Sequence, residues 1–287
     1  MSLLTAWNSW RRLDARQRAL IKEKEIDASM SLEEWIPFLG GIARFDRAGD
    51  GLRKALGWLT LISVPLGLIP AIVTDSPAPL LVWLLSLGLG ISWWRLRKID
   101  IPSSLDRFLL PWLTLLKEDI QPKSEVVLRL DLRGAEMDNK SLMASDMPRG
   151  LPKSPRNCQD TYFRDDWLSG TASLADGAVL RWQISDLVRQ RIKTRSNSRG
   201  KTKRKTKYKI QRSFDVQLSV RARDYQVAQL RPDTACRESV KHGEKRAAIR
   251  VRTRSIGHEL TTPPRLDELV GTVSRAYRHL SIAPKER

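Results

Sequence analysis

Two long stretches without a charged residue constrain this chain more than any other feature of its sequence. Between Lys54 and Asp75 lie twenty uncharged residues, ALGWLTLISVPLGLIPAIVT, and between Asp75 and Arg95 lie nineteen more, SPAPLLVWLLSLGLGISWW. A helix of about 20 mostly apolar residues is long enough to cross the hydrocarbon core of a bilayer. Because the connection that contains Pro77 and Pro79 is short and turn-rich, the sequence predicts an antiparallel transmembrane hairpin.

The residues that flank the two stretches predict an orientation for this hairpin. Lys and Arg lie at both outer ends and are missing from the connecting loop, and basic residues favour the cytoplasmic side of a membrane. Tryptophan rings prefer the membrane interface. The expected anchors are Arg53, Lys54, Trp58, Trp93, Trp94, Arg95, Arg97 and Lys98. The sequence thus predicts an integral membrane protein with both termini cytoplasmic. Since eukaryotic sorting signals are lacking, we expect a bacterial inner membrane; the alternative is a hairpin buried in a soluble core.

Composition shifts along the chain predict four segments. Residues 1–54 are expected to form amphipathic or interfacial helices, and residues 55–94 the hairpin, with helices over 55–74 and 77–94. Residues 95–122 are expected to form a juxtamembrane linking helix, and residues 123–287 a basic cytoplasmic domain. Within the first segment, Ser31 and Glu34 fit a capping box, which predicts that a helix begins there. Pro37 and the Gly40-Gly41 pair are expected to break that helix.

The last segment has the period-two pattern of β-strands. In EVVLRLDLR, residues 125–133, leucine alternates with charged residues, and residues 208–222 alternate even more regularly. Asp176-Gly177 is a strong hairpin-turn signal, and residues 247–256 predict a further strand. An apolar stripe after Pro264 predicts a C-terminal helix. The expected fold is an α+β membrane protein in which the hairpin precedes a mostly antiparallel sheet or small barrel with a C-terminal helix.

Positive charge is concentrated in this second half. The formal net charge is +19, and 41 of the 51 Lys and Arg residues follow Trp94. Ten of the twenty residues from Lys193 to Arg212 are basic and none is acidic. The sequence predicts a basic β-hairpin arm that binds an anion, because an anion would relieve the repulsion among its charges. The candidate anion-binding residues are Arg195, Arg199, Lys201, Lys203, Arg204, Lys205, Lys207 and Lys209.

Three interpretations of the arm stay open at this point. Anionic lipid headgroups would attract a polybasic segment close to a membrane. Nucleic acid or an acidic protein partner would bind the same charges, with strong salt dependence for nucleic acid. Tyr208 is the single aromatic residue of the arm, which gives weak support to base stacking. The third interpretation is a solvated charged loop.

No catalytic signature is present in the sequence. Cys158 and Cys236 are isolated, the three histidines lack ligand spacing, and phosphate-binding and nucleophile motifs are absent. Asp165 and Asp166 are interpreted as turn residues. We therefore expect no enzyme, no cofactor and no metal.

These observations predict a membrane-anchored, cytoplasm-facing binding or scaffold protein whose basic arm engages anionic lipid or an acidic partner. The main alternative is a subunit of an oligomeric membrane pore or effector complex, because pairs of small residues in the hairpin allow close helix packing and a homo-oligomer. The further alternative is a membrane-tethered nucleic-acid-binding protein.

Overall fold

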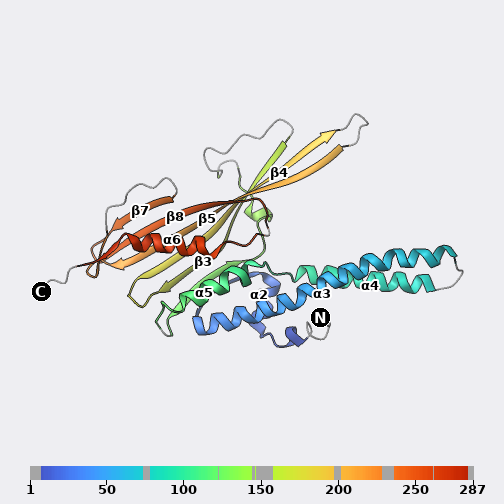
Figure 1. Ribbon diagram of the computed structural model, residues 1–287, viewed down its shortest axis with the longest axis horizontal. Helices are drawn as coiled ribbons and strands as arrows, with labels where there is room; N and C mark the ends of the chain where they lie inside the picture. The colour runs from blue at the N-terminus through green and yellow to red at the C-terminus, as the bar shows by residue number, and fades with distance from the viewer. Residues whose placement is uncertain are drawn as a thin grey trace. The chain divides into compact units, whose positions relative to one another are not determined.

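The computed structural model describes residues 8–73, 78–121, 123–143, 146, 158–196, 202–227, 236–260 and 262–283 (Figure 1). The chain divides into two compact units. Unit 1 comprises Met1–Glu23 and Pro37–Leu105, and unit 2 comprises Lys24–Ile36 and Asp106–Arg287.

Unit 2 is built on a seven-stranded sheet in which every neighbouring pair of strands is antiparallel. The strand order is β1-β2-β3-β4-β5-β8-β7. The strands are β1 (Glu25–Ser31), β2 (Glu125–Asp131), β3 (Cys158–Ser173), β4 (Val179–Ser196), β5 (Thr202–Arg221), β7 (Cys236–His242) and β8 (Arg246–Gly257). Two short strands, β6 (Tyr225–Val227) and β9 (Leu280–Ile282), pair separately. Because β3, β4 and β5 each exceed fifteen residues, they continue well beyond the ends of their shorter neighbours.

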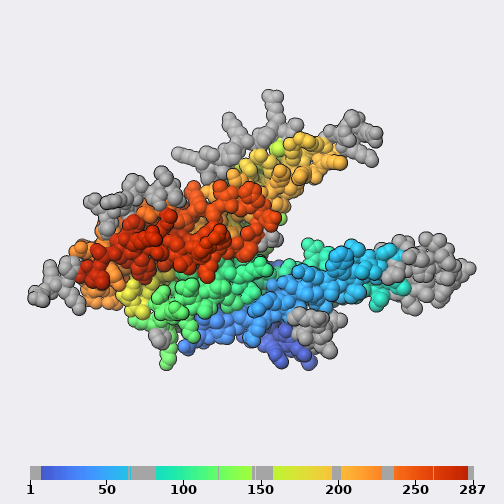
Figure 2. Space-filling model, in the orientation of Figure 1, coloured from blue at the N-terminus to red at the C-terminus, as the bar shows by residue number. Residues whose placement is uncertain are grey.

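One face of this sheet is covered and apolar. Alternate strand residues point to the same face, and the even positions from 180 to 188 of β4 and from 214 to 220 of β5 are buried, with Trp182 and Phe214 among the largest buried side chains. Three helical elements supply the cover: the π-helix η1 (Leu105–Leu109), α5 (Leu110–Leu116) and α6 (Leu266–Arg278). Trp112 of α5 contacts Trp182 edge to face, with their ring centres 5.7 Å apart. Figure 2 shows α6, in red, as a closely packed layer. The opposite face of the sheet is polar.

Unit 1 is helical, with α2 (Ala15–Glu23), most of α3 (Leu32–Val73) and α4 (Ala78–Lys98). The predicted capping box is confirmed, because the carboxylate of Glu34 accepts hydrogen bonds from the backbone N–H and the hydroxyl of Ser31. The predicted break at Pro37 and the Gly40-Gly41 pair is wrong, since α3 continues through all three residues. Gln17 stabilises this part of α3 by donating a hydrogen bond of 2.8 Å from its side-chain amide to the backbone carbonyl of Phe38.

The transmembrane prediction requires correction. Among the described residues, no helix is both long enough and apolar enough to cross a membrane. The first charge-free stretch is only the second half of α3, which begins at Leu32 and carries acidic and basic side chains up to Lys54; α4 ends on Arg95, Arg97 and Lys98. The predicted membrane fold class, the transmembrane character of the two helices, the inner-membrane localisation and the sidedness inferred from the flanking residues are therefore wrong.

Most of the predicted β-structure is confirmed. The alternating segments form β2, β5 and β8, the Asp176-Gly177 turn joins β3 to β4, and the apolar stripe forms α6. Gly177 has a φ of +79°, which a glycine adopts without strain. The sequence does not predict the strands β1 and β7, because their exposed and half-buried residues lack a clear apolar alternation.

Candidate functional site

The predicted basic arm is the far end of the three long strands. We define the arm as residues 158–163 of β3, 188–196 of β4 and 202–210 of β5. Pairing between β4 and β5 runs without a shift from Val179↔Ser219 to Ser196↔Thr202, so the arm continues the register of the sheet. On the β5 side, β8 ends where Gly257 pairs with Ile210, and the arm lies beyond that point (Figure 1).

The register divides the charges of the arm between its two faces. Residues directly opposite each other in an antiparallel pair share a face, as do alternate residues of one strand. One face, here called the basic face, carries Arg189, Arg191, Lys193 and Arg195 of β4 and Lys203, Lys205, Lys207 and Lys209 of β5. The opposite face carries the pairs Thr194↔Arg204 and Gln190↔Tyr208. Six of the eight predicted anion-binding residues are thus placed by the structure, and Arg204 is the one on the opposite face; Arg199 and Lys201 lie outside the described residues.

Every β4–β5 pair of the basic face joins two cations. The pairs are Arg189↔Lys209, Arg191↔Lys207, Lys193↔Lys205 and Arg195↔Lys203. Like charges directly opposite each other destabilise a sheet, by an amount on the order of 0.5 kcal/mol per pair. Arg191 is partly neutralised, as its guanidinium donates two 2.7 Å hydrogen bonds to the carboxylate of Asp160. The basic face as a whole retains repulsion that an external anion would relieve.

The opposite face of the arm is anchored by a small core of its own. Phe163, Val188 and Ile210 are buried there with Ala135, which belongs to the segment after β2. Glu136 follows it and accepts 2.7 Å hydrogen bonds from the hydroxyl of Tyr208 and the amide of Gln190. The arm is consequently a folded part of unit 2, and the ring of Tyr208 is held on the face away from the basic residues.

Buried ion pairs lie where the main core passes into the arm. Lys140 donates to Asp165 at 2.6 Å and to Asp131 at 3.0 Å, and Arg133 binds Asp131 through two nitrogens. Burial raises the pKa of Asp131, but the hydrogen bonds from Arg133 and Lys140 outweigh burial and lower that pKa to about 2. Burial raises the pKa of Asp165, and the hydrogen bond from Lys140 offsets only part of this effect. Because cations engage both carboxylates, the geometry favours a structural role for the cluster.

The expectation that Asp165 and Asp166 are turn residues is wrong, because both lie in β3, at an irregularity of the strand. The β3–β4 register shifts between Asp165 and Leu168. Asp165 is opposite Asp186, whose carboxylate receives two hydrogen bonds from Arg212, at 2.8 and 2.7 Å. The residues of the cluster are too far apart in sequence for any motif to reveal them.

The residues expected to anchor a membrane hairpin have other surroundings. Arg53 is 8% exposed and forms ion pairs with Asp46, Asp50 and Asp100. Those three carboxylates are close enough together to be considered as metal ligands, but the guanidinium of Arg53 already lies among them as their counter-charge. Lys54, Arg95 and Arg97 are exposed, and the side chain of Lys98 lies outside those described.

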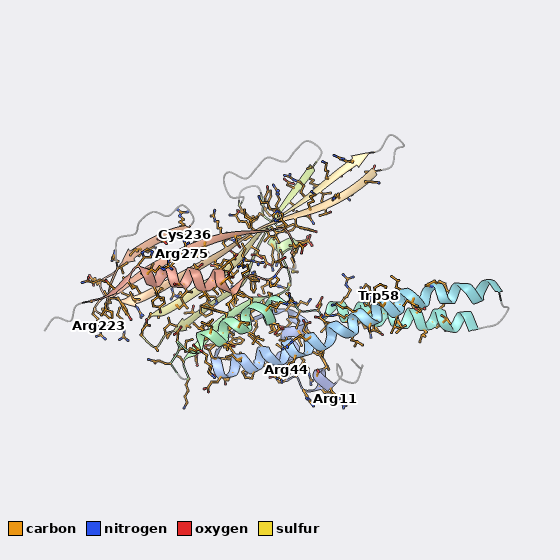
Figure 3. All side chains as sticks on the ribbon, in the orientation of Figure 1. Arg11, Arg44, Trp58, Arg223, Cys236 and Arg275 are labelled. Atoms are coloured by element: carbon orange, nitrogen blue, oxygen red, sulfur yellow. The ribbon has the colours of Figure 1, made fainter. Side chains whose placement is uncertain are left out.

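The tryptophan anchors differ from one another in exposure. Trp93 is half-buried, and the guanidinium of Arg97 lies 5.0 Å from its ring centre. Trp58 and Trp94 are 67% and 54% exposed, and Figure 3 labels Trp58 on the helical hairpin of unit 1. Exposed leucine and isoleucine side chains surround them on α3 and α4, and nothing in the structure shows what covers these side chains.

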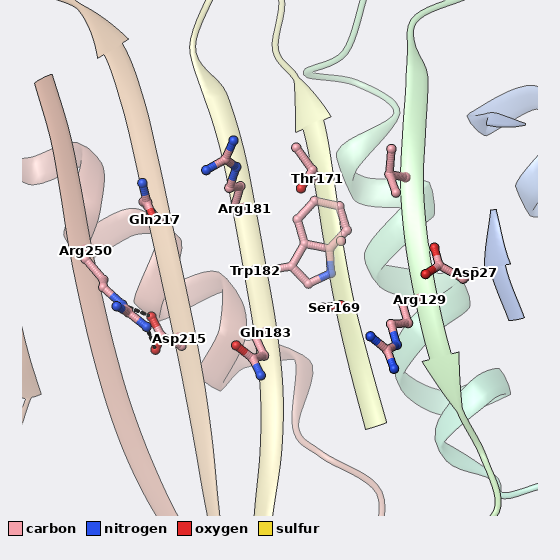
Figure 4. Close-up of a pocket in the computed structure, with 12 residues that line it drawn as sticks. Asp27, Arg129, Ser169, Thr171, Arg181, Trp182, Gln183, Asp215, Gln217 and Arg250 are labelled. Atoms are coloured by element: carbon pink, nitrogen blue, oxygen red, sulfur yellow. Dashed lines mark hydrogen bonds and ion pairs between the residues drawn. The ribbon is translucent and has the colours of Figure 1, made fainter. Parts of the chain in front are cut away.

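A hollow on the polar face of the sheet has no counterpart among the sequence predictions (Figure 4). Its volume is about 360 Å³, and its basic residues are Arg129, Arg181 and Arg250 from β2, β4 and β8. Each of these arginines is a polar position in an alternating strand, so the sequence indicates only that it faces away from the core. The strand order, which local patterns do not reveal, brings the three together.

Comparisons with known proteins do not identify a function. No protein-family model, no curated protein and no solved structure matches this chain.

Proposed function

We propose that this chain binds duplex nucleic acid through the basic face of the arm, by contacts to phosphate groups. The observation that carries the proposal is the segregation of charge: the register gathers eight cations on one face and pairs each with another cation between β4 and β5, while Asp160 of β3 neutralises only Arg191. A loop that served only solubility would not need this arrangement. An array of phosphates removes the repulsion and gains counterion release on binding.

The spacing of the charges supports a polyanion with a regular repeat. Successive pairs on one face of an antiparallel strand are about 6.8 Å apart, which gives one cation per about 3.4 Å of arm. One strand of a duplex presents one phosphate per about 3.4 Å along the helix axis. The two charge densities are therefore comparable.

Two features of the arm favour a duplex over the other anions considered. Proteins that bind single strands stack bases on aromatic rings, but Tyr208 lies on the opposite face and is hydrogen-bonded to Glu136. Tyr162 of β3 lies opposite Arg189 but is buried. Segments that bind membrane interfaces combine basic residues with apolar residues that insert. On β4 and β5 the basic face, between residues 189–195 and 203–209, presents only Lys and Arg, and β3 adds Cys158, Asp160 and the buried Tyr162 to it. Phosphate contact without insertion or stacking is the mode that these residues support.

The proposal is tested by salt titration of the full chain with a fluorescent DNA duplex of about two helical turns. The arm variant carries Lys203→Thr, Lys205→Thr, Lys207→Thr and Lys209→Thr. The matched control replaces Lys22, Lys54, Lys117 and Lys245 with Gln; these lysines are exposed, and the same number of charges is lost. The slope of log K against log salt is expected to become shallower by about 3.6 in the arm variant, at about 0.9 per phosphate contact, and to change by less than about 1 in the control.

Several outcomes would contradict the proposal. Equal changes of the salt slope in the arm variant and in the control would show that net charge, and not the basic face, governs binding. An absence of duplex binding at about 50 mM salt would refute the function outright. Tighter binding to phosphatidylserine vesicles than to the duplex at the same salt would assign the arm to lipid headgroups instead.

A pair of single substitutions tests the face itself. Arg204 and Lys205 are neighbours on β5 but lie on opposite faces. Lys205→Thr is expected to reduce the magnitude of the salt slope by about 0.9, whereas Arg204→Thr should leave it nearly unchanged. Equal effects of the two substitutions would contradict binding through one face.

A further inference from the structure

The hollow on the polar face of the sheet has a basic rim and a floor of mostly uncharged, hydrogen-bonding side chains. Arg129, Arg181 and Arg250 form the rim, and the floor includes Ser169, Thr171, Gln183 and Gln217. In the register, Arg181 and Arg250 are both opposite Gln217, and Arg129 is opposite Ser169 (Figure 4). Adjacent strands are about 4.8 Å apart, so two neighbouring rim arginines are separated by about two strand spacings across the sheet. Arg129 is also offset from Arg181 along the strands, because Ser169 is opposite Gln183.

The three arginines differ in what holds them. Arg250 is fixed by Asp215, which accepts two hydrogen bonds from it, at 2.7 and 2.6 Å. Burial raises the pKa of Asp215, but Arg250 and Arg252 outweigh burial and lower it, so this carboxylate stays ionised at neutral pH. Among the described residues, neither Arg129 nor Arg181 has a carboxylate within ion-pair distance. Asp27, the other acidic residue of the lining, is the register partner of Arg129.

The hollow and the basic face belong to one surface. Arg181 and Arg189 lie on the same face of β4, because they are separated by an even number of residues in a strand without a register shift. They are about 27 Å apart along the strand, and Arg181 is about 48 Å from Arg195, at about 3.4 Å per residue. The positions between them on this face, Gln183, Ser185 and Leu187, are uncharged. A small anion cannot reach both sites, whereas a polymer can.

We infer that the hollow is a second phosphate-contact site for the duplex that the basic face binds. The inference rests on the proposed function and specifies the length of duplex that the chain covers. Guanidinium groups bind phosphate with paired N–H donors, and the amide and hydroxyl groups of the floor supply further hydrogen bonds to the backbone. At a rise of about 3.4 Å per base pair, the arm alone covers about 6 base pairs, and the arm with the hollow covers about 14.

A series of duplex lengths tests this footprint. The full chain is titrated with hairpin-closed DNA stems of about 8, 12, 16 and 20 base pairs at constant salt, and each affinity is divided by the number of overlapping sites. The variant of the hollow, called the hollow variant, carries Arg129→Gln and Arg181→Gln. The control is Arg107→Gln with Arg278→Gln, which removes two other exposed arginines of unit 2.

The wild-type chain is expected to gain at least about tenfold in corrected affinity between the second and third stems of the series. The hollow variant should lose this step and keep its affinity for the shortest stem. The control should keep the step as well as the affinity for the shortest stem. A smooth dependence of affinity on stem length, or an unchanged step in the hollow variant, would overturn the inference. Binding to the shortest stem would then still support the proposed function of the arm. If no stem of any length bound, the proposed function would fail as well.

Discussion

The ion pairs around Lys140 show how much one residue can contribute to this fold. Lys140 is a single ammonium shared by two carboxylates, Asp131 and Asp165, and the side chains of Lys140 and Asp165 are each only 9% exposed. Removing one partner of a buried ion pair leaves an uncompensated charge, which costs about 3–5 kcal/mol. The contribution therefore depends on the whole set and cannot be assigned to one contact.

Lys140→Met is expected to lower the free energy of unfolding by about 3 kcal/mol at neutral pH. The loss should shrink in mild acid, because the raised pKa of Asp165 lets this carboxylate take up a proton in the folded state. Urea unfolding at neutral pH and at about pH 4 measures the difference. Adding Asp165→Leu to the same chain should recover most of the loss; a single substitution that costs less than about 1 kcal/mol at neutral pH would argue against a buried charge.

Among the strands, β3 depends on a position where no side chain fits. A Cβ at Gly170 would lie 2.2 Å from Cζ2 of Trp182 and 2.8 Å from Cδ2 of Leu128. The indole of Trp182 thus lies directly over the backbone of β3, which brings the covered face of the sheet into close packing. The hollow on the other face has the backbone of the same strand as part of its wall.

Gly170→Ala is expected to destabilise unit 2 by about 1–3 kcal/mol, because the added methyl group overpacks the core. Gly257→Ala in β8 is the matched control, since the nearest atom to its Cβ would be 3.9 Å away. Thermal unfolding of both variants tests the argument. Equal melting temperatures would contradict the close approach of Trp182 to β3.

In the helical hairpin of unit 1, apolar side chains lie on the surface as well as inside. Trp58 and Leu61 of α3 and Leu85 and Leu87 of α4 are each more than 60% exposed, whereas Leu52 and Leu56 of α3 are less than 10% exposed. Because transfer energy scales with the apolar area removed from water, the two groups should respond differently to polar substitution.

Replacing the four exposed residues with Gln is expected to raise solubility and to change the free energy of unfolding by less than about 1 kcal/mol. Leu52→Gln with Leu56→Gln should instead cost more than about 2 kcal/mol, since both side chains are buried. Solubility limits and urea midpoints of the two variants make the comparison. A large stability loss on replacing the exposed set would mean that those residues pack against something.

For the molecule as a whole, excess positive charge and buried carboxylates make stability sensitive to acid. The formal net charge is already +19 at pH 7, and protonation of carboxylates at low pH increases the repulsion. In unit 2 the pKa of Asp131 is lowered to about 2, and that of Asp215 is also lowered. A carboxyl group with a lowered pKa in the folded state contributes stability above its ordinary pKa and loses that contribution as pH falls through the lowered value.

The free energy of unfolding is therefore expected to fall as pH decreases from about 4 to about 2. The decrease from Asp131 alone is roughly 2 kcal/mol, because each pH unit between its folded and unfolded pKa corresponds to about 1.36 kcal/mol. Burial raises the pKa of Asp165, so this group acts in the opposite direction. Urea unfolding at about pH 7, 4 and 2 should show wild type and Asp131→Asn converging at the lowest pH. A constant difference between them would contradict the linkage.

The sequence by itself determined the elements whose side chains follow a local period. Alternation predicted β2, β5 and β8, the Asp-Gly pair predicted the β3–β4 turn, and the apolar stripe predicted α6, because backbone geometry alone dictates these patterns. It also located the basic segment. It misjudged the two charge-free stretches, since local composition does not show that the first one continues a helix that begins, with charged residues, at Leu32.

Only the tertiary structure decided which side chains meet. Strand register placed eight cations on one face of the arm and Arg204 on the other. Strand order brought Arg129, Arg181 and Arg250 around one hollow, and the return of the chain after β2 brought Lys140 to Asp165. The edge strands β1 and β7 exist through pairing with β2 and β8. The physical reason is that period and propensity act over a few neighbouring residues, whereas pairing is decided by the burial and hydrogen bonds of the complete sheet.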